Sequence, residues 1–288
     1  MTQNREKFEV RPLTAALGAE IAGVDLRSLD DETFDFIHAT LLESEVIFFR
    51  DTDFDDESQI ALAHRFGEPA IFPLSKVMGA TAPDIQVIED GPNSPNESDQ
   101  WHTDVTWIER PPKIALLRAS VVPERGGDTM WASMTTAYEA LSPSFRNLCD
   151  SLEVHHHHES FLAGVIRKMG SEKAEKLEIG KRLAEAYPGI DHPLVRTHPE
   201  TKRRSIFYGG GFMRHVNDVT ESESTFVLDF LERHIQKPEF HCRWQWRPGD
   251  LAIWDERSTL HRAVGDHFPA RRAIHRCVVE GDRPQFAA

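Results

Sequence analysis

The sequence predicts a β-rich α+β protein in which a few helices pack outside a β core. Two observations support this fold class. Short segments rich in β-branched and aromatic residues recur along the chain and often alternate apolar with polar residues, as half-buried strands do. Capped helical patterns are confined to a few places, and two of them precede most of the expected strands. We expect strands at residues 46–49, 113–122, 205–208, 240–246, 251–254 and 273–279.

Two helices are expected near the start of the chain. Residues 30–43 carry apolar side chains at helical spacing on one face, namely Phe34, Ile37 and Leu41. Residues 55–66 form the second helical pattern. Gly67 follows it directly and is a suitable C-cap, because glycine readily adopts the left-handed conformation that ends many helices.

Two more helices are expected further along the chain. The third begins at Ser142-Pro143, and its apolar positions are Phe145, Leu148, Cys149 and Leu152. The fourth begins at Thr220, which forms a capping box with Glu223, and its apolar positions are Phe226, Phe230, Leu231 and Ile235. The remainder of the chain is expected to be mainly strand and loop.

Composition excludes two classes of partner. The chain has 288 residues, of which 40% are hydrophobic and 28% charged, as in folded globular proteins. Its net charge of −14 would repel the phosphate backbone of nucleic acid. Apolar stretches such as residues 116–122, which Arg118 interrupts, are far shorter than the roughly 20 residues that span a bilayer. We therefore expect no nucleic-acid partner and no membrane span.

The N-terminus and the cysteines indicate the compartment. No apolar run or small-residue cleavage site follows the charged first residues, so we expect a cytoplasmic protein. Cys149, Cys242 and Cys277 lack the spacing of a disulfide framework or a thiolate zinc site, and we expect them to be buried thiols.

Residues 1–288 are expected to form a single domain, because no repeat and no Gly/Ser or Pro linker divides the chain. Two segments have the character of insertions. Residues 92–99 show turn chemistry and come just before the most informative motif, so this loop could border a pocket. Residues 168–191 are charged and loosely helical, and an excursion of this length outside a β core is commonly a lid or a subunit contact.

The most informative motif is Trp101-His102-Thr103-Asp104. On an extended strand, residues two apart point to the same face, so the His102 imidazole and the Asp104 carboxylate can share one metal ion. His261, beyond the apolar strand at 251–254, offers a third ligand. Two histidines and one carboxylate with open positions opposite form the facial triad of non-haem Fe(II) oxygenases. The alternative is an ordinary hydrogen bond, which a His and an Asp at this spacing often make.

Two arginines follow His261 on one expected strand. Arg272 and Arg276 are four residues apart, which places both guanidinium groups on the same face. Guanidinium groups bind carboxylates, sulfates and sulfonates bidentately, so two arginines beside a metal indicate two anionic ligands. The alternative is a solvated cationic strand.

At this point the chain resembles a known family, the taurine/2-oxoglutarate dioxygenases, which include 2,4-dichlorophenoxyacetate dioxygenase and alkylsulfatase relatives. The resemblance runs nearly end to end through LGAEIAGVDL at 17–26, WHTDVT at 101–106, GGDT at 126–129, HPLVRTHP at 192–199 and GDLAIWD at 249–255. It implies a double-stranded β-helix, or jelly-roll, core with flanking helices. It also implies Fe(II), 2-oxoglutarate as co-substrate, O₂ as oxidant, and a homo-oligomer, either a dimer or a tetramer.

The resemblance assigns roles to six residues. The iron ligands would be His102, Asp104 and His261. Thr129 and Arg272 fall on the positions that hold the distal carboxylate of 2-oxoglutarate. Arg276 falls on the position that binds the anionic group of a small-molecule substrate. Related halogenases lack the metal-binding carboxylate, so the presence of Asp104 implies hydroxylation.

The expected substrate differs from taurine. Taurine-specific family members carry a His, a Tyr and an Asn at positions that align here with Phe72, Ser75 and Ser98. These replacements remove three polar groups that hold the amine and sulfonate of taurine, so taurine is disfavoured. We expect hydroxylation next to a sulfonate or sulfate, with release of sulfite or sulfate.

Three further residues fall on the family's hydroxyl and aromatic wall positions: Ser160, Phe161 and Phe212. With Phe72, these phenylalanines could bury the hydrocarbon body of an anionic substrate at roughly 25 cal/mol per Å². Ordinary core packing is the alternative interpretation of each phenylalanine.

Two other functions remain open from the sequence. The same chemistry could act on a carboxylate, such as an aryloxyalkanoate or a biosynthetic acid, because Arg276 suits either anion. A jelly-roll protein that binds without turnover is the remote alternative, since no motif residue is missing. The internal run His155-His156-His157-His158 is expected on a strand or loop whose alternate imidazoles face solvent, where it would bind metal adventitiously.

Overall fold

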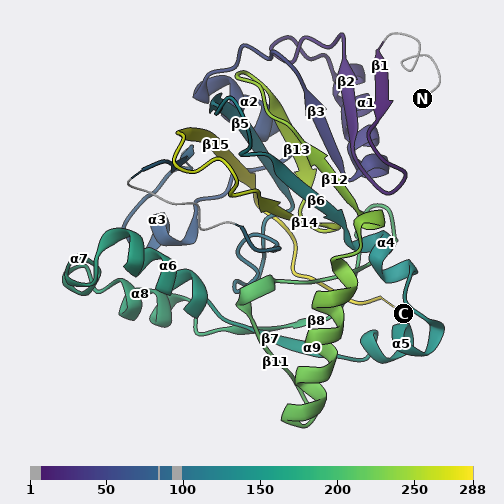
Figure 1. Cartoon of the computed structure of the whole chain (residues 1–288), viewed down its shortest axis with the longest axis vertical. Coiled ribbons are helices and arrows are strands. Elements are labelled where there is room, and N and C mark those ends of the chain that lie inside the picture. The colour runs from purple at the N-terminus through teal and green to yellow at the C-terminus, as the bar shows by residue number, and fades with distance from the viewer. Residues whose placement is uncertain (1–7, 84, 93–98, 288) are drawn as a thin grey trace.

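The computed structural model describes residues 8–83, 85–92 and 99–287 (Figure 1). The strands are β1 (Glu9–Pro12), β2 (Ala19–Ala22), β3 (Val46–Phe49), β4 (Gln86–Asp90), β5 (Ile114–Val121), β6 (Thr129–Ser133), β7 (Glu153–His156), β8 (Ile190–Pro193), β9 (Val195–Thr197), β10 (Arg204–Ile206), β11 (Met213–Val216), β12 (His241–Trp244), β13 (Leu251–Asp255), β14 (Thr259–Ala263) and β15 (Arg272–Val279).

Within the described residues these strands form four sheets. The main sheet has the order β1-β2-β3-β13-β5-β15-β4, and the minor sheet has the order β12-β6-β14. Two small sheets, β11-β7-β8 and β10-β9, lie in the middle of the chain. The main and minor sheets pack against each other through a cluster of aromatic side chains, namely Phe48, Trp131, Trp244 and Trp254.

The helices lie outside the sheets (Figure 1). They are α1 (Asp31–Ser44), α2 (Asp56–Phe66), α3 (Pro73–Val77), α4 (Met134–Glu139), α5 (Pro143–Cys149), α6 (Glu159–Met169), α7 (Ser171–Lys176), α8 (Ile179–Ala186) and α9 (Glu221–Ile235), with 3-10 turns η1 (Gly210–Phe212) and η2 (Pro238–Phe240). Helices α1 and α2 share a hydrophobic core with the main sheet. The structure is therefore a mixed α/β fold with several sheets and external helices.

Strand β13 contributes side chains to two hydrophobic cores, one on each face of the main sheet. Leu251 and Ile253 face the core shared with α1 and α2, whereas Ala252 and Trp254 face the cluster between the two sheets. Successive side chains of a strand point to opposite faces, so a continuous apolar run buries both faces of this central strand.

The capped helices match the sequence prediction. The Asp30 side chain accepts a hydrogen bond from Thr33 N at the start of α1, and Gly67 ends α2 with a φ of 144°. Helix α9 begins with the predicted capping box, in which Thr220 and Glu223 each bond to the other's backbone N–H. These local signals act within a few residues, which explains why the sequence locates them well.

Two apolar positions of the predicted helices are wrong. Leu148 is 41% exposed, and α5 ends at Cys149, so the expected face does not continue to Leu152 within the helix. Phe226 is 60% exposed, and its neighbour Val227 is buried instead. A helix turns about 100° per residue, so a face centred on Val227 leaves Phe226 pointing outward.

The six predicted strands are present with ends shifted by at most a few residues, but several strands have no sequence prediction. The important ones are β6 and β14 of the minor sheet. His261 was expected beyond the strand at 251–254, and it in fact lies in the middle of β14, in the other sheet. A turn at residues 256–258 separates β13 from β14.

The two insertion-like segments have different outcomes. Most of the loop at 92–99, which was expected to border a pocket, lies outside the described residues. Residues 168–191 include the end of α6, then α7 and α8, and the start of β8. In Figure 1, α6, α7 and α8 form a group beside α3, at one side of the sheets.

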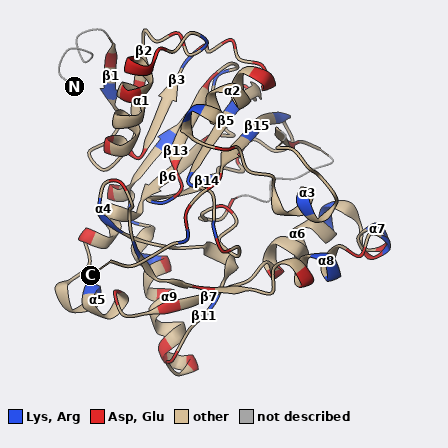
Figure 2. Ribbon diagram, turned by 180° about the vertical axis from the view of Figure 1, so that it is seen from behind, with Lys and Arg blue, Asp and Glu red and all other residues tan. Residues whose placement is uncertain are grey.

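Three further observations concern the core and the surface of the described residues. All three cysteines are buried, as predicted. None of the helices in the described part of the chain is both long and apolar enough to cross a bilayer. Acidic and basic residues are interspersed over the outer helices and loops (Figure 2).

The histidine run alternates as predicted. His155 and His157 are partly exposed, whereas His156 and His158 are buried. The buried His156 Nδ1 lies 2.9 Å from Thr106 Oγ1, and its ring packs edge-on against His192. Burial lowers the pKa of His156 to about 3, with a further contribution from His192. Burial likewise lowers the pKa of His192 to about 4.

Because the pKa values of His156 and His192 are lowered in the folded protein, we expect the free energy of unfolding to fall in mild acid. Between pH 6.5 and about 4 the unfolded chain binds protons that folded His156 and His192 do not, so the free energy of unfolding decreases as the pH falls through this window. We expect His156→Gln to show a shallower decrease of melting temperature from pH 6.5 to 4 than the wild type. The control is His155→Gln, which changes the partly exposed neighbour. Equal slopes for His156→Gln and the wild type would contradict the prediction.

Candidate active site

Three side chains that can bind a metal ion meet where the main and minor sheets face each other. One ligand atom from each of His102, Asp104 and His261 lies within 4.8 Å of the others. Asp104 Oδ1 is 3.8 Å from His102 Nε2 and 4.0 Å from His261 Nε2. Two imidazoles and one carboxylate at these separations fit a divalent transition metal that keeps open coordination positions.

The backbone brings the two histidines together. His102 and His261 form an isolated β-bridge, with His102 N donating to His261 O at 3.1 Å and His261 N donating to His102 O at 2.9 Å. The predicted extended strand is therefore only partly correct. His102 is extended, but Asp104 begins a turn in which Val105 has a φ of 54°. The turn still directs the Asp104 carboxylate to the side of His102.

Hydrogen bonds orient the His102 ring toward the cluster. Its Nδ1 lies 2.8 Å from the Gln100 carbonyl oxygen, which can only accept, so Nδ1 carries the proton. The lone pair of Nε2 is then available on the side of Asp104. A hydrogen-bonded Nδ1–H is the usual support of a metal-binding imidazole.

Burial and charge set the protonation of the cluster. Burial opposes the charged form of Asp104, but Arg276 and the two imidazoles outweigh it and hold the pKa of Asp104 below its usual value. Burial and the neighbouring His102 lower the pKa of His261 well below its usual value. The cluster thus offers an ionised carboxylate and a neutral imidazole, the protonation states that bind metal.

Arg272 lines a cavity that also contains His102 and His261, and it is 4% exposed. Its Nη2 donates to Thr129 Oγ1 at 3.1 Å, and its Nε donates to the Gly127 carbonyl at 2.8 Å. Thr129 Oγ1 also accepts from Trp246 Nε1 at 2.9 Å. Asp90, directly opposite Arg272 on β4, pairs with Nη1 at 3.4 Å. These contacts hold one guanidinium group in a fixed orientation inside the protein.

Arg276 lies four residues further along the same face of β15, where it contacts the metal-ligand cluster through Asp104. Its Nη1 donates to both oxygens of Asp104, at 2.9 and 2.8 Å. Its Nε and Nη2 donate to the Gln86 amide oxygen, and the guanidinium lies 5.4 Å from the centre of the Phe72 ring. Gln86 is neutral, so that edge of the guanidinium keeps positive charge that an anion can neutralise.

One cavity joins these groups. Its lining combines cluster histidines, both arginines and several apolar side chains: Ile88, His102, Leu117, Thr129, Trp254, His261, Ala263, Arg272, Ile274 and Arg276. Arg272, Ile274 and Arg276 alternate along β15, which is why they share this face, as the spacing predicts.

An apolar cluster borders Arg276 on the side of α3 and α6. Phe72, Phe161 and Phe212 all belong to it, together with the buried Trp107. The rings of Phe72 and Phe161 are 5.6 Å apart, and those of Phe161 and Trp107 are 5.7 Å apart. The structure therefore gathers the three phenylalanines singled out in the sequence from three separate segments.

The three serines differ in their surroundings. Ser75 is half-buried in α3. Ser160 is exposed and its hydroxyl donates to the Gly211 carbonyl at 2.8 Å, so it ties α6 to η1. Ser98 lies outside the described residues.

Sequence reasoning missed several polar residues that contact the site. Asp90 and Gln86 lie on β4 opposite Arg272 and Arg276, and Trp246 donates to Thr129. Glu256 is buried beside Asp104, and burial together with the Asp104 charge raises the pKa of Glu256 well above its usual value. The sequence signal for Glu256 was a second acidic residue directly after the apolar strand, in Trp254-Asp255-Glu256-Arg257.

A model of the family described as taurine catabolism dioxygenase TauD, TfdA matches residues 9–278. The chain belongs to this family. The family is named after dioxygenases, and the His-Asp-His cluster described above is present in this chain.

Three relatives of this TauD/TfdA family member are especially informative. It is 37% identical to an alkylsulfatase from Acinetobacter baylyi, over 96% of this chain and 86% of the relative. It is 35% identical to an alpha-ketoglutarate-dependent sulfate ester dioxygenase from Pseudomonas putida, over 96% of this chain and 91% of the relative. The crystal structure of a taurine dioxygenase from Burkholderia xenovorans matches with a TM-score of 0.79 and 34% identity, over 96% of this chain and 92% of that one.

Proposed function

We propose that the chain is an Fe(II)- and 2-oxoglutarate-dependent dioxygenase that hydroxylates a small anionic substrate at the carbon next to a sulfate or sulfonate group. The observation that carries the proposal is the arrangement around one cavity of a His-Asp-His cluster and two arginines from one strand face. The similarity to an alkylsulfatase and to a sulfate ester dioxygenase supports a sulfate ester in particular.

The donor set fits Fe(II). His102 and His261 would supply nitrogen ligands and Asp104 an oxygen ligand, with the remaining positions open toward the cavity. Fe(II) held by these residues would, together with 2-oxoglutarate, supply the activation of O₂ that couples loss of CO₂ from 2-oxoglutarate to hydroxylation of the substrate. The contribution of the chain is to fix which substrate carbon faces the metal and to exclude other reductants.

Arg272 and Thr129 would hold the distal carboxylate of 2-oxoglutarate. A buried guanidinium that is already fixed by the Gly127 carbonyl presents its remaining N–H groups in one orientation. The Thr129 hydroxyl, which accepts from Trp246, can donate its own proton to a carboxylate oxygen. This pair therefore recognises a carboxylate by both charge and geometry.

Arg276 and the apolar cluster would bind the primary substrate. The anionic group would replace Gln86 on the outer edge of the guanidinium, and the hydrocarbon body would extend toward Phe72 and Phe161. Burying an alkyl chain against such rings is worth roughly 25 cal/mol per Å² of apolar surface. The ammonium group of taurine would lose its hydration there without a compensating polar partner, which disfavours taurine.

Cleavage needs no further catalytic group. Hydroxylation places a hydroxyl on the carbon that carries the sulfate oxygen, and this product collapses to an aldehyde and releases sulfate. One oxygen atom of O₂ ends in succinate and the other in the aldehyde. For a sulfonate the same collapse breaks the C–S bond and releases sulfite.

Substrate-dependent succinate formation tests the proposal. The protein is purified without oxygen and supplied with Fe(II), 2-oxoglutarate and O₂, across alkyl sulfates, longer sulfonates, taurine and aryloxyalkanoates. We expect the highest turnover with an alkyl sulfate and little with taurine. Taurine as the best substrate would overturn the substrate assignment, and no metal-dependent turnover or binding at all would overturn the reaction.

A carboxylate substrate is the second candidate. The chain is 31% identical, over 96% of its length, to an (S)-phenoxypropionate/alpha-ketoglutarate-dioxygenase from Sphingobium herbicidovorans. A carboxylate can occupy the same edge of Arg276, and an aryl ring suits the same apolar cluster. The aryloxyalkanoates in the panel distinguish this candidate by release of a phenol.

Replacing Arg276 tests its role in substrate binding. We expect Arg276→Gln to raise the KM for the substrate about 100-fold, because truncating one partner of a buried charge pair costs about 3 kcal/mol. The matched control is Arg271→Gln, which removes an exposed arginine that pairs with Glu89 at 2.7 Å. An unchanged KM with a weakened metal affinity would show instead that Arg276 acts only on Asp104.

Several architectural expectations accompany this proposal. The main and minor sheets would be the two halves of a double-stranded β-helix, in one domain over residues 1–288. The segment 168–191 would act as a lid, supported by the packing of α7 and α8 on the apolar cluster and by a hydrogen bond from Arg182 to the Val77 carbonyl. The homo-oligomeric state and cytoplasmic location stay predictions, which light scattering and cell fractionation can check.

A further inference from the structure

A buried carboxylate with no assigned role lies directly behind the His-Asp-His cluster. Glu256 is 1% exposed and immediately follows β13. Its two oxygens accept hydrogen bonds from different donors: Oε1 from Trp254 Nε1 at 2.8 Å and Oε2 from the Asp104 backbone N–H at 3.2 Å. The same side chain thus connects the strand β13 to the turn that presents Asp104.

Glu256 also faces His261. The His261 Nδ1 atom is buried and has no hydrogen-bond partner within the described ranges, and Glu256 Oε1 lies 3.8 Å from it. Trp254, which donates to that same oxygen, packs against the His261 ring in a tilted arrangement with centroids 4.9 Å apart. A carboxylate behind an imidazole orients the ring and favours the tautomer whose Nε2 lone pair faces the metal.

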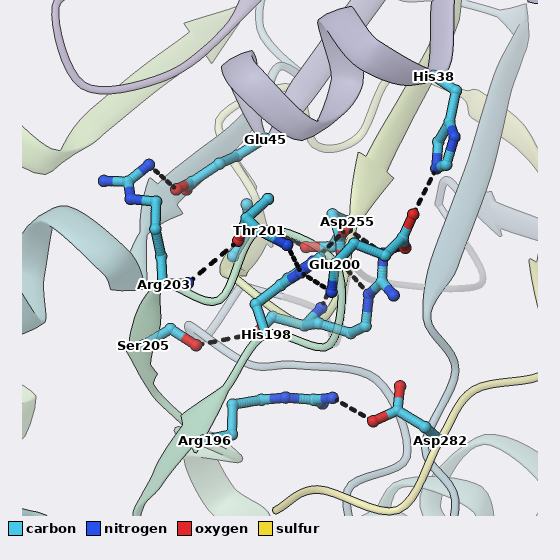
Figure 3. Close-up of polar contacts among 12 residues, drawn as sticks. His38, Glu45, Arg196, His198, Glu200, Thr201, Arg203, Ser205, Asp255 and Asp282 are labelled. Carbon is cyan, nitrogen blue, oxygen red and sulfur yellow. Dashed lines mark hydrogen bonds and ion pairs between the residues drawn. The ribbon is translucent and has the colours of Figure 1, made fainter. Parts of the chain in front are cut away.

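The turn that carries Glu256 is held from several sides. The Glu256 backbone N–H donates to the Lys113 carbonyl at 3.0 Å. The preceding Asp255 points the other way, into a buried polar network in which its carboxylate accepts from His198 Nε2 at 3.0 Å and from Arg257 (Figure 3). Because the Glu256 backbone and the adjacent Asp255 and Arg257 side chains are held by these hydrogen bonds, the Glu256 side chain stays against Asp104 and His261.

We propose that Glu256 is a positioning residue that holds Asp104 and His261 in the geometry that binds iron. This inference rests on the proposed function, because it concerns the metal that the cluster would hold. Two acceptor oxygens are needed for two separate N–H donors. Glutamine has a single acceptor oxygen, so its NH₂ group would face one of those donors and that hydrogen bond would be lost.

Metal affinity, measured apart from activity, tests the proposal. The dissociation constant for Co(II) is measured calorimetrically, and the charge-transfer absorption of the complex with Fe(II) and 2-oxoglutarate is recorded without O₂. We expect Glu256→Gln to weaken metal binding about 10-fold or more, as substitutions behind metal ligands commonly do, and to shift the absorption band. The matched control is Glu200→Gln, since Glu200 pairs with Arg257 at 2.8 Å on the far side of the turn. We expect its metal affinity to stay within about twofold of the wild type.

The outcomes separate this inference from the proposed function. Failure of the wild type to bind Co(II) or Fe(II) would overturn the proposed function. Wild-type binding together with equal affinity in a folded Glu256→Gln variant would overturn the positioning role alone. Should Glu256→Gln fail to fold, Glu256→Asp keeps both oxygens but withdraws them by one methylene from Asp104, and the same comparison of metal affinity then decides.

Discussion

Replacing Asp104 with alanine is expected to abolish 2-oxoglutarate turnover. The substitution removes one of three ligand atoms that lie within 4.8 Å of one another. It also leaves Arg276 without the carboxylate that its Nη1 contacts at 2.9 and 2.8 Å, so a positive charge would remain beside the metal position. We expect a loss on the order of 10³-fold in turnover, which corresponds to about 4 kcal/mol. Succinate formation and Co(II) binding provide the measurements.

A carboxylate outside the site serves as the control for Asp104. Asp31 pairs with Arg65 at 2.8 Å on the surface, and its side chain is 97% exposed. Asp31→Ala removes an exposed ion pair of small energetic value, so its turnover should equal that of the wild type. Persistent full activity in Asp104→Ala would overturn the metal assignment.

Replacing Arg272 with leucine is expected to raise the KM for 2-oxoglutarate about 100- to 1,000-fold. Truncating a buried, hydrogen-bonded charged group costs about 2–5 kcal/mol, and here it also leaves Asp90 buried beside the lost guanidinium. Arg272→Lys keeps the charge but not the planar fork that reaches both Thr129 and the Gly127 carbonyl, so we expect an intermediate KM.

Two comparisons control the Arg272 experiment. Thr129→Val removes one hydrogen-bonding hydroxyl, worth about 1 kcal/mol, and should raise the KM for 2-oxoglutarate about fivefold. Arg271→Gln changes the exposed neighbour of Arg272 and should leave that KM unchanged. An Arg272→Leu variant that melts like the wild type and retains its KM would show that the co-substrate carboxylate binds elsewhere.

The sequence located those parts of the fold that depend on local signals. The capping box at Thr220, the proline at Pro143 and the glycine at Gly67 each act through the backbone of one turn, and the helices begin or end there. The faces of two helices were less predictable. Phe226 and Leu148 are exposed because the partner surfaces of α9 and α5 are formed by distant segments.

Two strands of the minor sheet, β6 and β14, were not predicted for a related reason. β6 and β14 are five residues each, and they are held by pairing with each other along the register that places Trp131 opposite His261. Strand propensity is weak over such lengths, and long-range pairing decides the outcome. Because β14 was not predicted, His261 was expected after the strand at 251–254 and not within a strand of the other sheet.

The candidate site was predictable as a set of residue types but not as a complete constellation. The spacing of Arg272 and Arg276 placed both side chains on one face of β15, because alternation along a strand is a local property. Their partners Asp90 and Gln86 come from β4, about 185 residues earlier in the chain, and only the pairing of the two strands aligns them.

The sequence by itself determined the helix caps, the alternation of strand faces, the family and the residue types that can bind iron, 2-oxoglutarate and an anion. These are properties of short stretches, or of motifs that can be matched without knowing distances. The tertiary structure decided that His102 and His261 meet through a single β-bridge, that three phenylalanines gather in one apolar cluster that reaches Arg276 through Phe72, and that Glu256 lies behind the metal-ligand cluster. Each of these depends on contacts between segments distant in the chain, and such contacts arise only when the sheets pack together.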